Sequence, residues 1–204
     1  MNMQSLNLLH AGAFLPAMPL VLDENRKFDE AGQRRLVRYY MEAGVDGLAV
    51  AVHTTQFTIR DPKINLFETV LRVVKSEMDA YSARSGRHLL AIAGVCGEAP
   101  QAVAEAKLAG SIGYDAVLVS PGGLGHLTEE QLIERTRLIA EVMPVVGFYL
   151  QVAVDGHHVL DGTDLLPIVV GEGLCHPERG GRQGCALQPL PDRRRGSRHR
   201  LRGS

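Results

Sequence analysis

The sequence predicts an α/β fold built on a parallel sheet, and two features support this. Short apolar runs that do not alternate with polar residues recur between residues 13 and 150, as in strands that are covered on both faces. Segments with the apolar spacing of amphipathic helices separate these runs, and parallel neighbours need such crossover connections. We therefore expect five parallel strands that alternate with four helices.

The first expected strand covers residues 13–20, provided that Pro16 and Pro19 occupy unpaired positions. Asp29 is suited to cap a helix over residues 29–43, because its carboxylate can accept a hydrogen bond from a free N–H of the first turn. The residues spaced for one buried face of this helix are Leu36, Val37, Tyr40 and Ala43.

Gly44 follows this helix and can end it at a positive φ without strain. The second expected strand, residues 48–52, comes next, and a helix over residues 64–85 follows and closes at Gly86. The residues expected to face inward from that helix are Leu66, Val70, Leu71, Val74 and Met78. Residues 88–95 form the third expected strand.

Pro100 marks the first turn of the next helix, which runs to Gly113. Residues 115–120 form the fourth strand, and the capping box at residues 128–131 opens a helix to residue 140. The expected buried side of this last helix consists of Leu132, Ile133, Thr136, Ile139 and Ala140. Residues 144–150 form the fifth strand.

Two architectures fit this alternation, a doubly wound sheet and a (β/α)8 barrel. No glycine-rich phosphate loop precedes the helix after the second strand, which disfavours the nucleotide-binding sheets. The pattern of elements alone leaves the choice open.

The composition is that of a soluble globular domain, with 45% hydrophobic and 22% charged residues. No apolar run is long enough to span a membrane, and Met1–His10 lacks the pattern of a signal peptide, so we expect a cytoplasmic protein without a membrane partner. Cys96, Cys175 and Cys185 lack metal-binding spacing, which argues against a disulfide framework and a structural zinc site.

Four segments decide between the architectures when they are taken together. They are Gly44–Gly47 with His53–Thr55, Ile92–Val95, Gly113–Pro121, and Pro144–Tyr149. Their order and spacing resemble the dihydrodipicolinate synthase and N-acetylneuraminate lyase family over residues 12–170. The resemblance implies a (β/α)8 TIM barrel, a pyruvate-like keto acid substrate, and class I aldolase chemistry through a lysine Schiff base. It calls for no cofactor and no metal, and it implies a homo-oligomer for a full-length protein.

The resemblance also assigns roles to three residues. Thr54 and Thr55 match the threonine pair that holds the substrate carboxylate, and Thr54 would relay protons. Tyr149 matches the tyrosine that passes a proton during Schiff-base formation. The alternative is structural, because threonines at a strand exit often satisfy local backbone groups and a buried tyrosine is most often a core residue.

The sequence departs from the family around these residues. His53, Gln56 and Phe57 stand where a glycine and a glycine–glutamate pair usually flank the threonines. Residues 121–125 lack the usual aromatic pair. No arginine follows Tyr149 in the next loop, which argues against a second substrate that carries a carboxylate.

The Schiff-base lysine is missing from the expected place. In the family it lies on the sixth strand, fewer than thirty residues after the tyrosine, but the last lysine here is Lys107. The lysines of this chain fall in expected helices, helix entries or loops, and they are Lys27, Lys63, Lys75 and Lys107. We therefore assign no Schiff-base lysine.

The composition of the sequence changes near residue 170. Residues 171–204 contain eight arginines against three acidic residues, no lysine and no periodicity. A complete barrel takes about 250 residues, so we expect residues 1–170 to be a partial barrel of about five of the eight β/α units. We expect residues 171–204 to be an irregular basic tail that is not family sequence and that arises from a frameshift or a truncated gene model. A nucleic-acid arm is disfavoured, because the tail offers no aromatic residue for stacking and no recognition fold.

Two functional hypotheses follow. The first is a carbon–carbon lyase or aldolase that acts on a pyruvate-like keto acid. The second is a catalytically inactive fragment that survives as a fold remnant or binding protein. A metal-dependent aldolase is a weaker alternative, which rests on residues expected after strands, namely His53, Glu98, His126 and His157.

Overall fold

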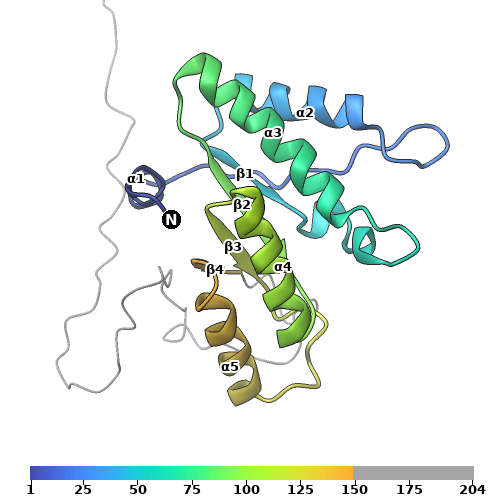
Figure 1. Cartoon of the computed structure of the whole chain (residues 1–204), viewed down its shortest axis with the longest axis vertical. Helices are drawn as coiled ribbons and strands as arrows, with labels where there is room; N and C mark the ends of the chain where they lie inside the picture. The colour runs from blue at the N-terminus through green and yellow to red at the C-terminus, as the bar shows by residue number, and fades with distance from the viewer. Residues whose placement is uncertain (149–204) are drawn as a thin grey trace, which may run out of the picture. The chain divides into compact units, whose positions relative to one another are not determined.

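Four parallel strands form one sheet, in the order β1-β2-β3-β4 (Figure 1). The structure is a computed structural model, and it describes residues 1–148. The strands are β1 (Gly47–Val50), β2 (Leu90–Val95), β3 (Ala116–Val119) and β4 (Val145–Gly147). A doubly wound sheet reverses its strand order at a switch point. The described strands show no such reversal, and their consecutive order is that of a (β/α)8 barrel.

The expected first strand over residues 13–20 is reduced to a single bridge, in which Ala17 lies opposite Ala49 of β1. The Met18 N–H donates to the Ala49 carbonyl at 2.8 Å, and the Ala49 N–H donates to the Pro16 carbonyl at 3.1 Å. Pro16 has no N–H to donate, so the regular ladder is interrupted there, although the Asp46 N–H still donates to the Phe14 carbonyl at 3.1 Å.

The described α-helices are α1 (Met3–His10), α2 (Glu30–Glu42), α3 (Phe67–Ser85), α4 (Ala99–Ile112) and α5 (Glu129–Ala140). Three of them, α2, α4 and α5, begin and end close to where the sequence predicts, whereas α3 begins at Phe67, later than the expected residue 64. Asp29 Oδ1 accepts from the Gly32 N–H at 2.8 Å, and Thr128 with Gln131 forms the expected capping box. Gly86 and Gly113 end α3 and α4 at φ values of 69° and 99°, which glycine adopts without strain.

Helix α1 has no counterpart among the expected elements, and one buried serine fixes it to the sheet. Ser5 Oγ donates to Asp115 Oδ1 at 2.6 Å and lies 2.8 Å from His88 Nε2. Because a hydroxyl has one hydrogen, His88 must donate its Nε2–H to Ser5. His88 and Asp115 precede β2 and β3, so α1 is held at the amino ends of these strands.

The core lies between the sheet and the helices that connect its strands. Helices α3 and α4 pack against β2, and α5 packs against β4. The inward residues expected on α3 are buried or partly buried, as predicted. On α5 the prediction is wrong for Ile133, which is 60% exposed, whereas Arg135 is 2% exposed. Arg135 turns inward because its Nε donates to the Gly97 carbonyl at 2.7 Å.

Some sequence predictions fall beyond the described residues. Tyr149, the end of the fifth expected strand and the tail over residues 171–204 all lie outside residues 1–148. None of the helices within residues 1–148 is long and apolar enough to cross a membrane. The cytoplasmic location and the homo-oligomer stay predictions.

Candidate functional site

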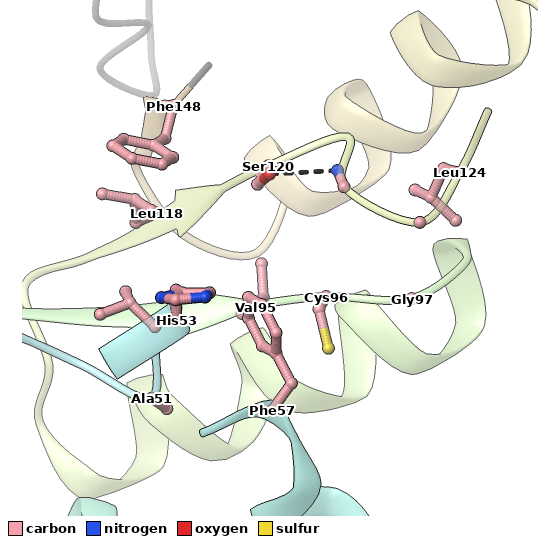
Figure 2. Close-up of a pocket in the computed structure, with 14 residues that line it drawn as sticks. Ala51, His53, Phe57, Val95, Cys96, Gly97, Leu118, Ser120, Leu124 and Phe148 are labelled. Atoms are coloured by element: carbon pink, nitrogen blue, oxygen red, sulfur yellow. Dashed lines mark hydrogen bonds between the residues drawn. The ribbon is translucent and has the colours of Figure 1, made fainter. Parts of the chain in front are cut away.

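A pocket of about 390 Å³ lies at the carboxyl ends of β1, β2 and β3 (Figure 2). Its volume is in the range of small-molecule sites. The side chains on its walls come from the exits of all four described strands, and they include His53, Phe57, Cys96, Ser120 and Phe148. In barrels with parallel strands, sites are built at this end, where the loops that follow the strands converge.

The described walls of the pocket are mainly apolar. Three side chains bring a polar heteroatom to them, and these are His53, Cys96 and Ser120. Ser120 Oγ accepts from the Gly122 N–H at 3.1 Å, which holds the loop after β3 (Figure 2). Burial raises the pKa of the Cys96 thiol, so the thiol is neutral near pH 7 and is a weak nucleophile.

The threonine pair lies at the exit of β1, as predicted, in a short turn over His53–Thr55. Thr55 is fully buried, and its Oγ1 donates to the Met18 carbonyl at 2.6 Å. Thr54 is exposed, and its Oγ1 lies 3.5 Å from the same carbonyl, which is long for this type of hydrogen bond. His53 lines the pocket, and the two threonines are not among its lining residues. Their role in binding a carboxylate stays a prediction.

Two residues around this turn adopt positive φ without being glycine. Ala51 has a φ of 61° and Gln56 a φ of 73°. Such conformations cost on the order of 1 kcal/mol or more, and they concentrate at functional sites. Gln56 stands where the family usually has a glycine, so the departure seen in the sequence leaves a strained residue beside the pocket.

We expect Gln56→Gly to raise the free energy of unfolding by about 1 kcal/mol, because glycine tolerates the positive φ and the exposed Gln56 side chain contributes little packing. Gln56→Ala is the matched control, since alanine keeps the strain and should leave stability nearly unchanged. Urea denaturation of the full chain measures both. A loss of stability in Gln56→Gly would show that the positive φ is not strained in solution.

No lysine of the chain lines the pocket. All four lysines of the sequence lie within the described residues, and none is among the lining residues. Lys75, on α3, pairs with Asp79 one helical turn away. The described pocket therefore offers no amine for a Schiff base.

Three charged side chains that sequence reasoning missed lie buried beside the pocket, namely Arg60, Glu105 and Arg135. Arg60 Nε donates to Glu105 Oε1 at 2.9 Å, and both side chains are 9% exposed. The Arg60 guanidinium also lies over the Phe67 ring, with Cζ 4.5 Å from the ring centroid. Arg60, Glu105 and Arg135 come from segments far apart in the sequence, so no local pattern predicts their meeting.

The residues considered for a metal do not converge. Within residues 1–148, no group of three histidine, cysteine or acidic side chains is arranged to hold an ion. Glu98 and His126 form an exposed pair at 3.2 Å, whereas His53 lies edge-on against Phe57. The fourth candidate, His157, lies outside the described residues.

Comparison with known proteins connects this fold to solved structures. No protein-family model matches the chain, and no curated protein matches its sequence. The prophage protein YagE from E. coli K12, of the dihydrodipicolinic acid synthase family and solved in complex with pyruvate, aligns with a TM-score of 0.60 at 20% identity. That alignment covers 71% of this chain and 46% of YagE.

Two further structures agree with this likeness. N-acetylneuraminate lyase from Mycoplasma synoviae aligns with a TM-score of 0.58 at 20% identity, over 70% of this chain and 48% of the lyase. Dihydrodipicolinate synthase from Oceanobacillus iheyensis aligns with a TM-score of 0.59 at 17% identity, over 69% and 45% of the two chains.

These alignments confirm, at the level of the fold, the resemblance seen in the sequence. The described residues have part of the TIM-barrel fold of the dihydrodipicolinate synthase and N-acetylneuraminate lyase structures. The chain spans about half the length of the solved structures that it matches.

Proposed function

We propose that the pocket at the carboxyl ends of β1, β2 and β3 binds a pyruvate-like keto acid, as part of a carbon–carbon lyase of the aldolase type. The observation that carries this proposal is the position of the pocket, which opens beside the His53–Thr55 turn in a fold shared with lyases and synthases. The pyruvate complex of YagE supports the choice of ligand.

The geometry of the threonine pair suggests how the carboxylate would be held. The Thr55 hydroxyl donates its hydrogen bond to the Met18 carbonyl, so its oxygen can only accept further hydrogen bonds, and a carboxylate has no hydrogen to donate. The Thr54 hydroxyl is exposed and only weakly bound, so it can turn and donate. Thr54 is therefore the proposed donor to the carboxylate, and Thr55 fixes the turn that presents it. Tyr149 is the proposed proton donor and acceptor.

The position of the lysines favours a second candidate, in which this chain binds a keto acid without turning it over. Schiff-base chemistry needs an amine in the site, and the pocket has none among its described walls. An inactive binding protein with a lyase fold would keep the pocket and the threonine turn and lose only the covalent step.

Borohydride trapping of the full chain with pyruvate separates the two candidates. A lysine amine that condenses with the ketone loses water to form an imine, and borohydride reduces the imine to a stable secondary amine. A mass increase on a lysine that matches the reduced adduct, an N-(1-carboxyethyl) group, would support the lyase. Pyruvate binding in saturation-transfer NMR without a mass increase would support the inactive binding protein.

Substitutions test whether Thr54 contributes to the binding of pyruvate. We expect Thr54→Val to weaken pyruvate binding about tenfold, the usual effect of losing one hydrogen bond to a charged group. Thr58→Val is the matched control, because Thr58 is an exposed threonine on the same loop and has no proposed contact with the ligand. If the full chain neither binds pyruvate nor is trapped by it, the proposed function is overturned.

A further inference from the structure

The backbone of the pocket wall is held by the three buried charged side chains Arg60, Glu105 and Arg135, which we call the ionic cluster. Arg60 Nη2 donates to the carbonyls of Ala51 at 3.2 Å and Gly94 at 2.9 Å. Ala51 directly follows β1, and Gly94 lies near the end of β2. One guanidinium thus ties two neighbouring strands together at the end where the pocket opens.

The other two members hold the loop after β2. Glu105 Oε2 accepts from the Cys96 N–H at 3.2 Å, and Arg135 Nε donates to the Gly97 carbonyl at 2.7 Å. Glu105 Oε1 also accepts from Gln101 Nε2 at 2.9 Å. The residues whose backbone the cluster binds all line the pocket, and they are Ala51, Gly94, Cys96 and Gly97.

The cluster is costly for a purely structural device. It sets two guanidinium groups against one carboxylate, and burying charges carries a desolvation penalty that apolar packing would avoid. Among the described residues, Arg60 Nη1 and Arg135 Nη2 are buried without a hydrogen-bond partner. An arrangement with unpaired donors is not the one that stability alone favours.

We propose that Arg60, Glu105 and Arg135 are positioning residues that fix the exits of β1 and β2 and thereby set the shape of the pocket. The planar Arg60 fork suits this task, because it reaches Glu105 and two carbonyls at once and is held in place over the Phe67 ring. Ala51 keeps its strained φ of 61° while its carbonyl is bound to Arg60. The proposal concerns the shape of the pocket and holds whichever ligand the pocket takes.

Cys96 supplies a reporter inside the pocket. Burial is the largest effect that raises the pKa of its thiol, the Arg60 and Arg135 charges lower it, and the Glu105 charge raises it. These groups come from the loop after β1, from α4 and from α5, and Gln101 Nε2 lies 3.6 Å from Cys96 Sγ. A change in the cluster should therefore change how Cys96 titrates.

The test uses the full chain with Cys175 and Cys185 replaced by serine, so that Cys96 is the one remaining cysteine. Two quantities are measured, the pH dependence of Cys96 alkylation by iodoacetamide and the hydrogen exchange of amides in residues 94–97. We expect Arg60→Gln to raise the thiol pKa and to speed amide exchange about tenfold, as for the loss of one hydrogen bond. Glu105→Gln should lower the thiol pKa.

A second arginine supplies the matched control. Arg87 also binds backbone carbonyls, with Nη2 2.7 Å from the Val45 carbonyl and Nη1 3.1 Å from the Met41 carbonyl. Because these carbonyls precede the amino end of β1, Arg87→Gln should alter stability and leave both Cys96 titration and exchange at residues 94–97 unchanged.

Arg60→Lys separates charge from geometry. Lysine keeps the positive charge near Cys96 but lacks the fork, so we expect a nearly normal thiol pKa together with fast amide exchange. Unchanged exchange at residues 94–97 in folded Arg60→Gln and Arg60→Lys would overturn the proposal. Unfolding of every cluster variant while Arg87→Gln stays folded would also overturn it, because the cluster would then support the whole fold.

Discussion

Replacing Glu105 with alanine is expected to lower the free energy of unfolding of the full chain by about 3–5 kcal/mol, the usual cost of breaking a buried ion pair. Glu105 accepts hydrogen bonds from Arg60, Gln101 and the Cys96 backbone, and the residue is buried away from water. Its removal leaves the buried guanidinium of Arg60 without its anionic partner. Arginine cannot release its proton at any ordinary pH, so the chain cannot relieve the charge by neutralising it.

An exposed pair provides the control for this prediction. Glu134 on α5 lies 2.8 Å from Arg137, and about half of each side chain is exposed. Surface pairs of this kind contribute little, so Glu134→Ala should cause a far smaller loss than Glu105→Ala. Urea denaturation, with the slope of the transition compared between variants, measures both. Equal losses would mean that Glu105 is hydrated in solution and that the ionic cluster is not buried.

The elements that local chemistry specifies could be predicted from the sequence. Gly86 and Gly113 end helices at positive φ, and Thr128 with Gln131 closes a capping box, because these functions depend on residues within one turn. Strands β1 and β2 were recognisable because their apolar runs are buried along their whole length. The alternation of elements fits two architectures, and the family resemblance, which implied a (β/α)8 barrel, predicted the consecutive strand order that the structure shows.

The interactions between distant segments could not be predicted. Arg60 and Glu105 are 45 residues apart, and Ser5 reaches Asp115 over 110 residues. A buried arginine also reverses the usual apolar pattern, which is why the expected face of α5 included Ile133 instead of Arg135. A pattern of apolar residues places a helix on its sheet but does not reveal a charge that finds its partner elsewhere.

The sequence directed attention to the exit of β1, and the roles of the residues there stay predictions. The exit of β1 was expected to carry the chemistry, and the pocket opens there. Three consecutive side chains in a tight turn point in different directions, so His53 reaches the pocket while the Thr55 hydroxyl bonds to Met18. Spacing in the sequence identifies such a turn without telling which of its side chains faces the ligand.

Replacing Gly47 with alanine is expected to lower the free energy of unfolding by about 3 kcal/mol, at the upper end of the usual cost of overpacking. A Cβ at this position would press against the carbonyl oxygen of Leu90, and it would lie 2.7 Å from Leu90 Cβ and 2.8 Å from Leu15 Cδ2. Gly47 lies opposite Leu90 in the β1–β2 ladder. The clash involves backbone, so a side-chain rotation cannot relieve it, and the two strands must separate.

Gly125→Ala is the matched control, because no atom lies within 4 Å of a Cβ added there and its φ is not positive. That change should be neutral or slightly stabilising, since alanine restricts the unfolded chain. Thermal and urea denaturation compare the two variants. If Gly47→Ala were as stable as Gly125→Ala, Gly47 could not lie against Leu90 in the register that the structure shows. That register brings the carbonyls of Ala51 and Gly94 within reach of Arg60, so the account of the pocket wall would then also be wrong.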